Sequence, residues 1–228
     1  DPVGVRRYYT LIASLPPLPH FEKARHLPIN RERLQSRLRM LHEDDRELVR
    51  RLSSFLRWHH QPRERSDATI VQEYGELRRS IDGTPCARLV EDTVTQRTLV
   101  VALRRRQRGL PAPAVDEPWG LGPWVGALRR NWERPEFGLA GVFPWLGRAR
   151  ALLDAREALE AERFLVGLEW ERLARARPLD AFRFEALLVY LFRWSVLEQW
   201  LSYAAEAAGT RFDELVMEAI GDYDQLLH

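Results

Sequence analysis

Cysteine and lysine are the two residues this chain most lacks, and each scarcity excludes a kind of chemistry. Cys86 is the single cysteine, which excludes an intramolecular disulfide framework and any metal or iron–sulfur site built from several cysteines. Lys23 is the single lysine among 35 basic residues, so Schiff-base and phosphate-loop mechanisms have almost no candidate residue. The cysteine usage fits a reducing compartment, and we expect a cytoplasmic protein.

The chain also lacks net charge and long apolar runs. Its 35 basic and 33 acidic residues nearly cancel, so no strong overall field attracts nucleic acid or anionic lipid. Its longest apolar runs fall far below the ~20 residues that span a bilayer. Arg6 and Arg7 precede an apolar stretch at residues 8–15. Two prolines follow that stretch where a signal peptide has small residues, so we expect no targeting segment.

What the sequence does contain is apolar residues at helical spacing, whereas the alternation typical of strands is missing after the first fifteen residues. Capping residues bound the expected helices, with Asn30 before one helix and Pro85 at the first position of another. The expected helices cover residues 31–41, 43–58, 67–81, 85–107, 143–177, 180–208 and 212–222. We therefore predict an all-α fold, a multi-helix bundle in two or three helical lobes.

A segment rich in proline and glycine, residues 109–123, interrupts the helical pattern. Such a composition is typical of a loop or of a linker between folded units. We therefore predict an N-terminal helical lobe at residues 1–108, a connection at residues 109–123, and a C-terminal lobe at residues 124–228. The C-terminal lobe contains the long central helix, residues 180–208.

This central helix is the element on which the other helices are expected to pack. Asp180 can cap its start, and Gly209 can end it in the left-handed conformation. Residues 186–192 are all apolar, which indicates a position in the core. Arg193 lies next to them, and a buried guanidinium needs a carboxylate partner from another element. The candidates for this structural ion pair are Glu157, Glu160 and Glu169.

No motif for catalysis or for a cofactor or metal is visible. The glycines lack the lysine and hydroxyl residue of a phosphate loop, and the six histidines form no pair at metal-ligand spacing on a helix. Cys86 lies near a helix N-terminus, which can lower a thiol pKa, but a small, half-buried helix residue is the simpler interpretation. We therefore expect no catalytic residue, no cofactor and no metal, and no enzymatic activity.

Two clusters of side chains are candidates for contacts with a protein partner. The first is a tryptophan-rich region after the proline- and glycine-rich segment, and the second is a group of arginines at the end of a helix. Arginines at that end also suit the helix dipole, and no DNA-reading motif accompanies them. The candidate contact residues are Trp119, Trp124, Trp132, Arg104, Arg105 and Arg108.

The C-terminal third carries a motif of a known family. Its matching residues are Val189, Tyr190, Leu191, Phe192, Arg193, Leu201, Gly209 and 212–216. In this motif the chain resembles the closing segment of the C-type subunit of V/A-type rotary ATPases, which is related to the eukaryotic d-type subunit. Residues 8–18 and 41–58 are similar to a bacterial family of uncharacterised proteins encoded beside V-type ATP synthase genes. The chain departs from the C-type pattern where that pattern has a glutamate and an Arg-Asn pair, because this sequence has Ser195, Gln199 and Trp200 instead.

The resemblance implies a helical funnel with a non-catalytic role. The C-type subunit is a central-stalk spacer that joins the rotor axle to the membrane ring and transmits torque in ATP-driven proton or sodium transport. The implied partners are the other rotary ATPase subunits, with no small-molecule substrate, and with membrane contact only through those proteins at the inner face of the cell membrane. Three alternatives stay open: a free-standing helical protein-binding adaptor or ATPase assembly factor, an arginine-rich nucleic-acid-binding protein, and an enzyme whose catalytic groups are brought together only by folding.

Overall fold

All regular secondary structure in the described part of the chain is helical. The computed structural model describes residues 6–56, 67–176, 178 and 180–226. The elements in order are α1 (Tyr9–Ala13), η1 (Phe21–Lys23), α2 (Arg31–Leu38), α3 (Glu43–Leu56), α4 (Asp67–Ser80), α5 (Pro85–Gln107), α6 (Val125–Arg130), η3 (Pro135–Gly138), α7 (Leu146–Asp154), α8 (Ala158–Arg175) and α9 (Phe184–Leu226). Within these residues, Arg7 and Arg183 form an isolated antiparallel bridge but no strand. The predicted all-α class is confirmed for the described residues.

Local sequence signals account for several helix ends. The Asn30 side chain accepts a hydrogen bond from the backbone N–H of Arg33 at 2.9 Å and so caps α2. α5 covers the predicted residues and has Pro85 in its first turn. α3 begins at Glu43, as the acidic residues 43–45 before the apolar stripe predict, because negative side chains favour the positive helix end.

The predicted helix at residues 143–177 is two helices, α7 and α8. The chain turns between them at Arg156, which has a left-handed backbone with φ of 57°. This turn brings α8 back against α7, so that Leu146 of α7 and Leu165 of α8 share one apolar core. Burial of the two apolar faces against each other therefore outweighs the helical continuity that the sequence pattern predicts.

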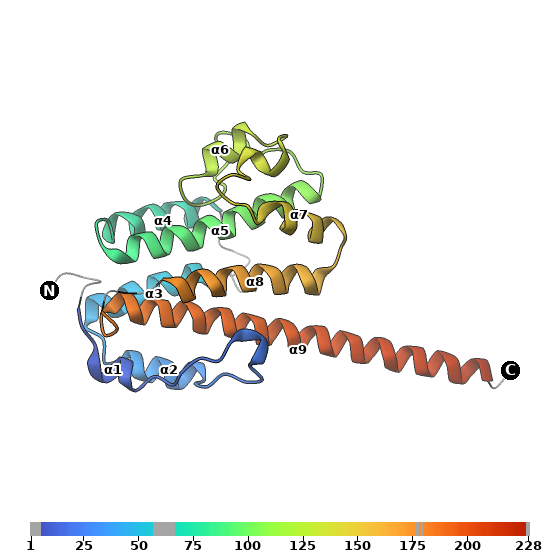
Figure 1. The fold of residues 1–228 in the computed structure, drawn as a ribbon, viewed down its shortest axis with the longest axis horizontal. Helices are drawn as coiled ribbons and strands as arrows, with labels where there is room; N and C mark the ends of the chain where they lie inside the picture. Colours follow the sequence, from blue (N-terminus) through green and yellow to red (C-terminus); the bar gives the residue numbers. More distant parts are fainter. Residues whose placement is uncertain (1–5, 57–66, 177, 179, 227–228) are drawn as a thin grey trace.

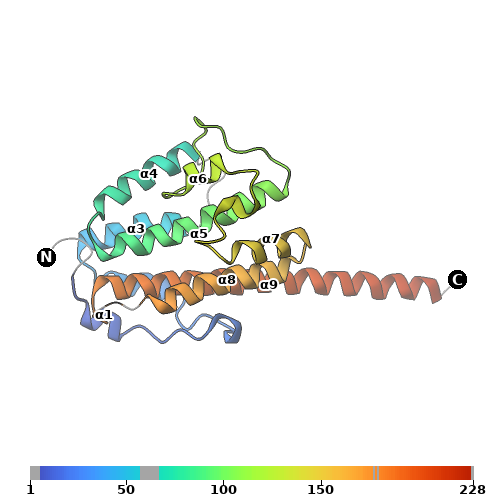
Figure 2. The ribbon, with the colours of Figure 1, turned by 45° about the horizontal axis from the view of Figure 1, so that its top comes forward.

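α9 continues through Gly209, so the predicted helix end there is wrong, and the predicted last helix at residues 212–222 is part of α9. A glycine inside a helix costs roughly 1 kcal/mol relative to alanine, which is too little to end a helix without a competing contact. α9 has 43 residues and is about 65 Å long at 1.5 Å per residue. Figures 1 and 2 show its C-terminal part projecting well beyond the other helices.

The start of α9 is attached to the N-terminal segment. The backbone N–H of Phe184 donates to the Arg6 carbonyl oxygen at 2.8 Å. The Tyr8 hydroxyl donates to Asp45 of α3 at 2.5 Å, and Asp45 is fully buried. The Asp180 side chain accepts from the backbone N–H of Phe182 at 2.9 Å in a turn that precedes α9. Because α9 begins at Phe184, the predicted helix start and cap at Asp180 are wrong.

The helices form layers with α8 and α9 side by side in the middle. In Figure 1, α5 with α4, α6 and α7 lies on one side of this pair, and α1 and α2 lie on the other. Two apolar clusters fill the interior. The first joins side chains of α1–α4, the first half of α5, the end of α8 and α9, and the second joins the end of α5, α6, η3, α7 and the middle of α8.

These two cores do not follow the predicted lobes at residues 1–108 and 124–228. Leu187 and Leu197 of α9 lie in the first core with Leu34 and Leu52 of the N-terminal helices. The connection at residues 109–123 also contributes, because its Trp119 and Leu121 are buried. The proline- and glycine-rich segment is therefore packed against the helices and is not a free linker.

Candidate functional site

Arg193 does not form the predicted ion pair. Its guanidinium carbon lies 4.4 Å from the centre of the Trp170 ring of α8, a cation–π contact. Glu160 instead pairs with Arg163, and Glu169 pairs with Arg97, while Glu157 precedes α8 on the exposed surface. An aromatic face thus takes the place of these three carboxylates. Burial lowers the pKa of Arg193, because a less polar surrounding disfavours the charged form, whereas the charge of Glu171, a further carboxylate of α8, acts on Arg193 and opposes this shift.

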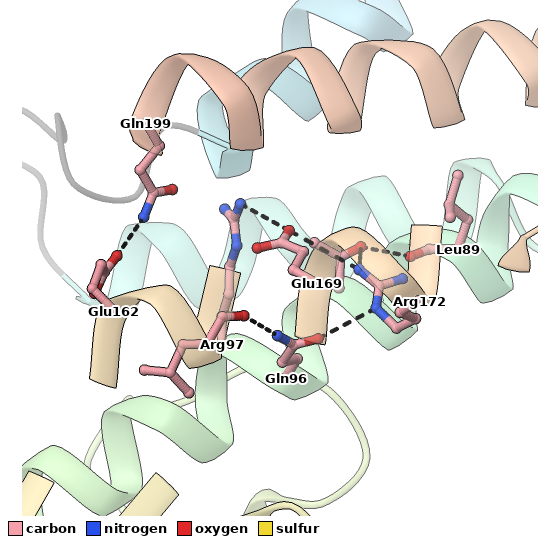
Figure 3. A network of polar contacts seen from close by, with 9 residues as sticks. Leu89, Gln96, Arg97, Glu162, Glu169, Arg172 and Gln199 are labelled. Carbon is pink, nitrogen blue, oxygen red and sulfur yellow. Dashed lines mark hydrogen bonds and ion pairs between the residues drawn. The ribbon is translucent and has the colours of Figure 1, made fainter. Parts of the chain in front are cut away.

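The carboxylate of Glu169 belongs to a polar network between α5 and α8, shown in Figure 3. It lies 3.4 Å from Arg97 and 4.0 Å from Arg172. Arg172 also donates to the Thr93 hydroxyl at 2.8 Å and to the Gln96 side chain at 3.4 Å. Burial and the charge of Arg97 both lower the pKa of Arg172, whereas Glu169 opposes this shift. A single carboxylate therefore holds two neighbouring guanidinium groups together.

A second carboxylate, Glu162 of α8, forms a separate group of polar contacts that reaches α9. It accepts a hydrogen bond from Arg104 of α5 at 3.1 Å and another from Gln199 of α9 at 3.2 Å. Glu162 is only 9% exposed, so these contacts are made away from bulk water. The three long helices are thereby joined by polar contacts as well as by apolar packing. Together we call Thr93, Gln96, Arg97, Arg104, Glu162, Glu169, Arg172 and Gln199 the interhelix network.

The tryptophans predicted to contact a partner are mostly inside the protein. Trp119 and Trp132 are 7% and 4% exposed, and their rings meet edge to face with centroids 6.2 Å apart. Trp124 is half-buried against Phe143, with centroids 5.2 Å apart. This correction follows from the size of the indole ring, which stabilises a small core most when it is buried.

The arginines predicted to contact a partner are also engaged within the chain, with one exception. Arg104 belongs to the interhelix network, and Arg105 pairs with Glu117 at 2.6 Å. Arg106 donates to the Trp132 and Arg134 carbonyl oxygens and lies over the Phe137 ring at 4.5 Å. Arg108 is exposed. Arg105 and Arg106 therefore hold the segment that follows α5 against the end of that helix.

Thr98 of α5 holds the proline- and glycine-rich segment, and sequence reasoning missed this residue. Its hydroxyl donates to the Leu121 carbonyl oxygen and accepts from the Leu121 N–H, both at 2.9 Å. Gly122 on one side has φ of 90°, and a Cβ there would lie 3.1 Å from the Thr95 hydroxyl. The close approach of this loop to α5 therefore needs glycine. The sequence signal for this contact is the presence of several threonines among the apolar residues of α5, and the structure shows them buried.

Cys86 is fully buried, more so than expected. Burial raises the pKa of its thiol to about 12, and the nearby Glu185 carboxylate adds to this rise. A thiol with that pKa holds almost no thiolate at neutral pH, and the thiolate is the reactive form. We predict that a thiol reagent at pH 8 leaves Cys86 unmodified in the folded protein and modifies it fully in urea. Labelling of the native protein at the rate of an exposed thiol would contradict this prediction.

Within residues 6–56, 67–176, 178 and 180–226, no group of three or more His, Cys, Asp or Glu side chains is placed to hold a metal ion. None of the described helices combines the length and apolar character that crossing a membrane requires. The polar and aromatic contacts described above join the helices to one another, and the C-terminal end of α9 projects beyond them. No family model matches the chain, and no match is found among curated proteins or among solved structures.

Proposed function

We propose that this chain is a non-catalytic spacer of the central stalk of a V/A-type rotary ATPase, placed between the rotor axle and the membrane ring. The observation that carries the proposal is the shape of α9. Its first part, as far as Trp200, is built into the first core, whereas the part after Gly209 extends past the other helices. A helix held at one end and free at the other can reach a partner at a fixed distance from the body.

The interhelix network supports the same role. A part that transmits torque has to resist relative movement of its helices. Glu162 contacts α5 and α9 at once, and Glu169 contacts two arginines across the α5–α8 interface. Buried polar contacts of this kind favour one relative position of the helices, because any displacement leaves a buried charge without its partner. On this proposal the protein acts at the inner face of the cell membrane and contacts the membrane only through its protein partners.

Co-purification with the rotary ATPase subunits tests the proposal. The full chain and a variant that ends at Gly209 are tagged and recovered from cells that contain the ATPase. We expect axle and ring proteins with the full chain and only background with the shorter variant. Because Tyr203 is the last α9 side chain that packs on the core among those the structure describes, the shorter variant should keep its melting temperature and most of its helical circular dichroism. Absence of all ATPase subunits from the full-chain preparation would reject the proposal.

A free-standing adaptor or assembly factor is the second candidate, because the same projecting helix suits either role. Stoichiometry separates the two: a spacer stays in the mature complex at a fixed ratio, and an assembly factor is absent from it. The nucleic-acid alternative is disfavoured by the contacts of Arg104, Arg105 and Arg106, which are made within the chain. Salt-dependent binding to DNA or RNA would bring that alternative back.

A further inference from the structure

A groove lies between α2, α3 and α9, beside the first core. Its volume is about 330 Å³, and ligand sites commonly measure ~300–1,000 Å³. Its walls are apolar, with Leu34 from α2, Leu52 from α3 and Leu191 from α9. These three side chains are at most 6% exposed, so they line the inside of the groove and offer an apolar surface that an alkyl chain can contact.

An ion pair lines one end of the groove. Arg31 of α2 lies 2.6 Å from both carboxylate oxygens of Glu198 of α9, and its guanidinium carbon is 5.9 Å from the centre of the Trp194 ring. All three residues line the groove. The negative charge of Glu198 is therefore matched at this end.

The other end lies where α3 and α9 both begin. Tyr8 contacts Asp45 at the start of α3 and the ring of Phe184 at the start of α9, so these two starts are neighbours. Arg46 follows Asp45 and lines the groove together with Leu188 of α9. From there to Glu198, α9 advances about 15 Å at 1.5 Å per residue, which is close to the length of an extended dodecanoate chain.

Arg46 is the charged residue available to a ligand at this end of the groove. Arg50, one turn further along α3, is paired with Glu47 at 2.6 Å. Arg46 is exposed, and among the described residues its side chain forms no ion pair or hydrogen bond. An apolar groove with a positive group at its mouth is complementary to an alkyl chain with a negative head.

We infer that this groove binds the alkyl chain of an anionic amphiphile of the fatty-acid class, with its head group at Arg46 and its chain end near the Arg31–Glu198 pair. The inference does not depend on the rotary ATPase proposal, because it concerns a different face of the molecule from the free end of α9. A carboxylate head or a phosphate head would satisfy Arg46, and the two are separated by experiment.

Calorimetric titration of the full chain tests the inference. The probes are dodecanoate, dodecyl phosphate and dodecyltrimethylammonium, each below its micelle concentration. We expect one site for an anionic probe and no binding of the cationic probe. Tighter binding of dodecanoate than of dodecyl phosphate assigns a carboxylate head, and the reverse order assigns a phosphate head. Equal binding of anionic and cationic probes would overturn the inference, because it would indicate partition without a site.

Three variants locate the site. Arg46→Gln should weaken binding of the anionic probe by roughly tenfold, as expected for loss of a hydrogen bond between charged groups, without affecting the fold. Val49→Trp should fill the groove, which Val49 lines, and abolish binding. Arg88→Gln on α5 is the control, because that side chain is 91% exposed and lies outside the groove. Unchanged binding by Arg46→Gln and by a folded Val49→Trp would overturn the inference. Failure of all the amphiphiles to bind would also overturn the inference. If an acidic peptide of residues 210–226 binds instead, the groove is a protein interface.

Discussion

Trp170→Ala is expected to lower the free energy of unfolding by about 3–5 kcal/mol, the usual cost of deleting a large buried aromatic side chain. Trp170 is 2% exposed and packs against the rings of His20 and Phe21, with centroids 5.7 and 6.0 Å away. Its ring also supports the guanidinium of Arg193. Removing it leaves both a cavity between η1 and α8 and a half-buried cation without its aromatic partner. Urea denaturation followed by circular dichroism measures the loss.

The matched variant for this experiment is Trp170→Phe, which keeps an aromatic face for Arg193 and most of the packing. We expect it to cost clearly less than the alanine variant. A double-mutant cycle with Arg193→Met isolates the cation–π contact, for which the coupling expected is about 0.5–2 kcal/mol. Coupling near zero, or a loss of less than about 1 kcal/mol for Trp170→Ala, would show that Trp170 does not have the structural role assigned to it.

Glu169→Gln is expected to have the second largest effect, a loss of about 2–4 kcal/mol, because it leaves two partly buried guanidinium groups without their shared carboxylate. The Glu169 side chain is 13% exposed, and those of Arg97 and Arg172 are 16% and 23% exposed, so solvent screens this site weakly. The charge of Arg97 already lowers the pKa of Arg172 in the native protein. Removing the negative charge between them turns an attraction into a repulsion.

Glu160→Gln is the control on the same helix. Glu160 pairs with Arg163 at 2.9 Å, but its side chain is 52% exposed. Exposed pairs of this spacing contribute about 0.3–0.5 kcal/mol. We therefore expect the melting temperature of Glu160→Gln to stay close to that of the unchanged protein, while that of Glu169→Gln falls by several degrees. Equal shifts for the two variants would show that the interhelix network does not stabilise the fold.

Local chemistry explains where sequence reasoning succeeds. The cap at Asn30, the proline at the start of α5 and the arginine-rich end of α5 act within one or two turns, so the sequence alone predicts them well. The buried run at the start of α9 is predictable for a similar reason, because seven consecutive apolar residues leave no polar face for solvent.

The errors have a common cause in long-range packing. Local conformational preferences favour helical continuity near Arg156, but burial of α8 against α7 turns the chain there. They also favour a helix end at Gly209, but among the described residues no tertiary contact there competes with the helix, so α9 continues. Loop composition favours exposure of Trp119 and Trp132, although the loop folds onto α5 through Thr98. The rule that a buried charge needs an opposite charge predicts a carboxylate beside Arg193. In the tertiary structure the guanidinium lies over the face of the Trp170 ring.

The sequence by itself determined the all-α class of the described residues and most helix starts, since these depend on residue types and on spacing of a few positions. Only the tertiary structure decided which charges are paired, which aromatic rings are buried, that α9 runs on beyond the body, and that α2, α3 and α9 enclose a groove. Such features depend on contacts between residues far apart in the chain, and local periodicity carries no information about which faces meet.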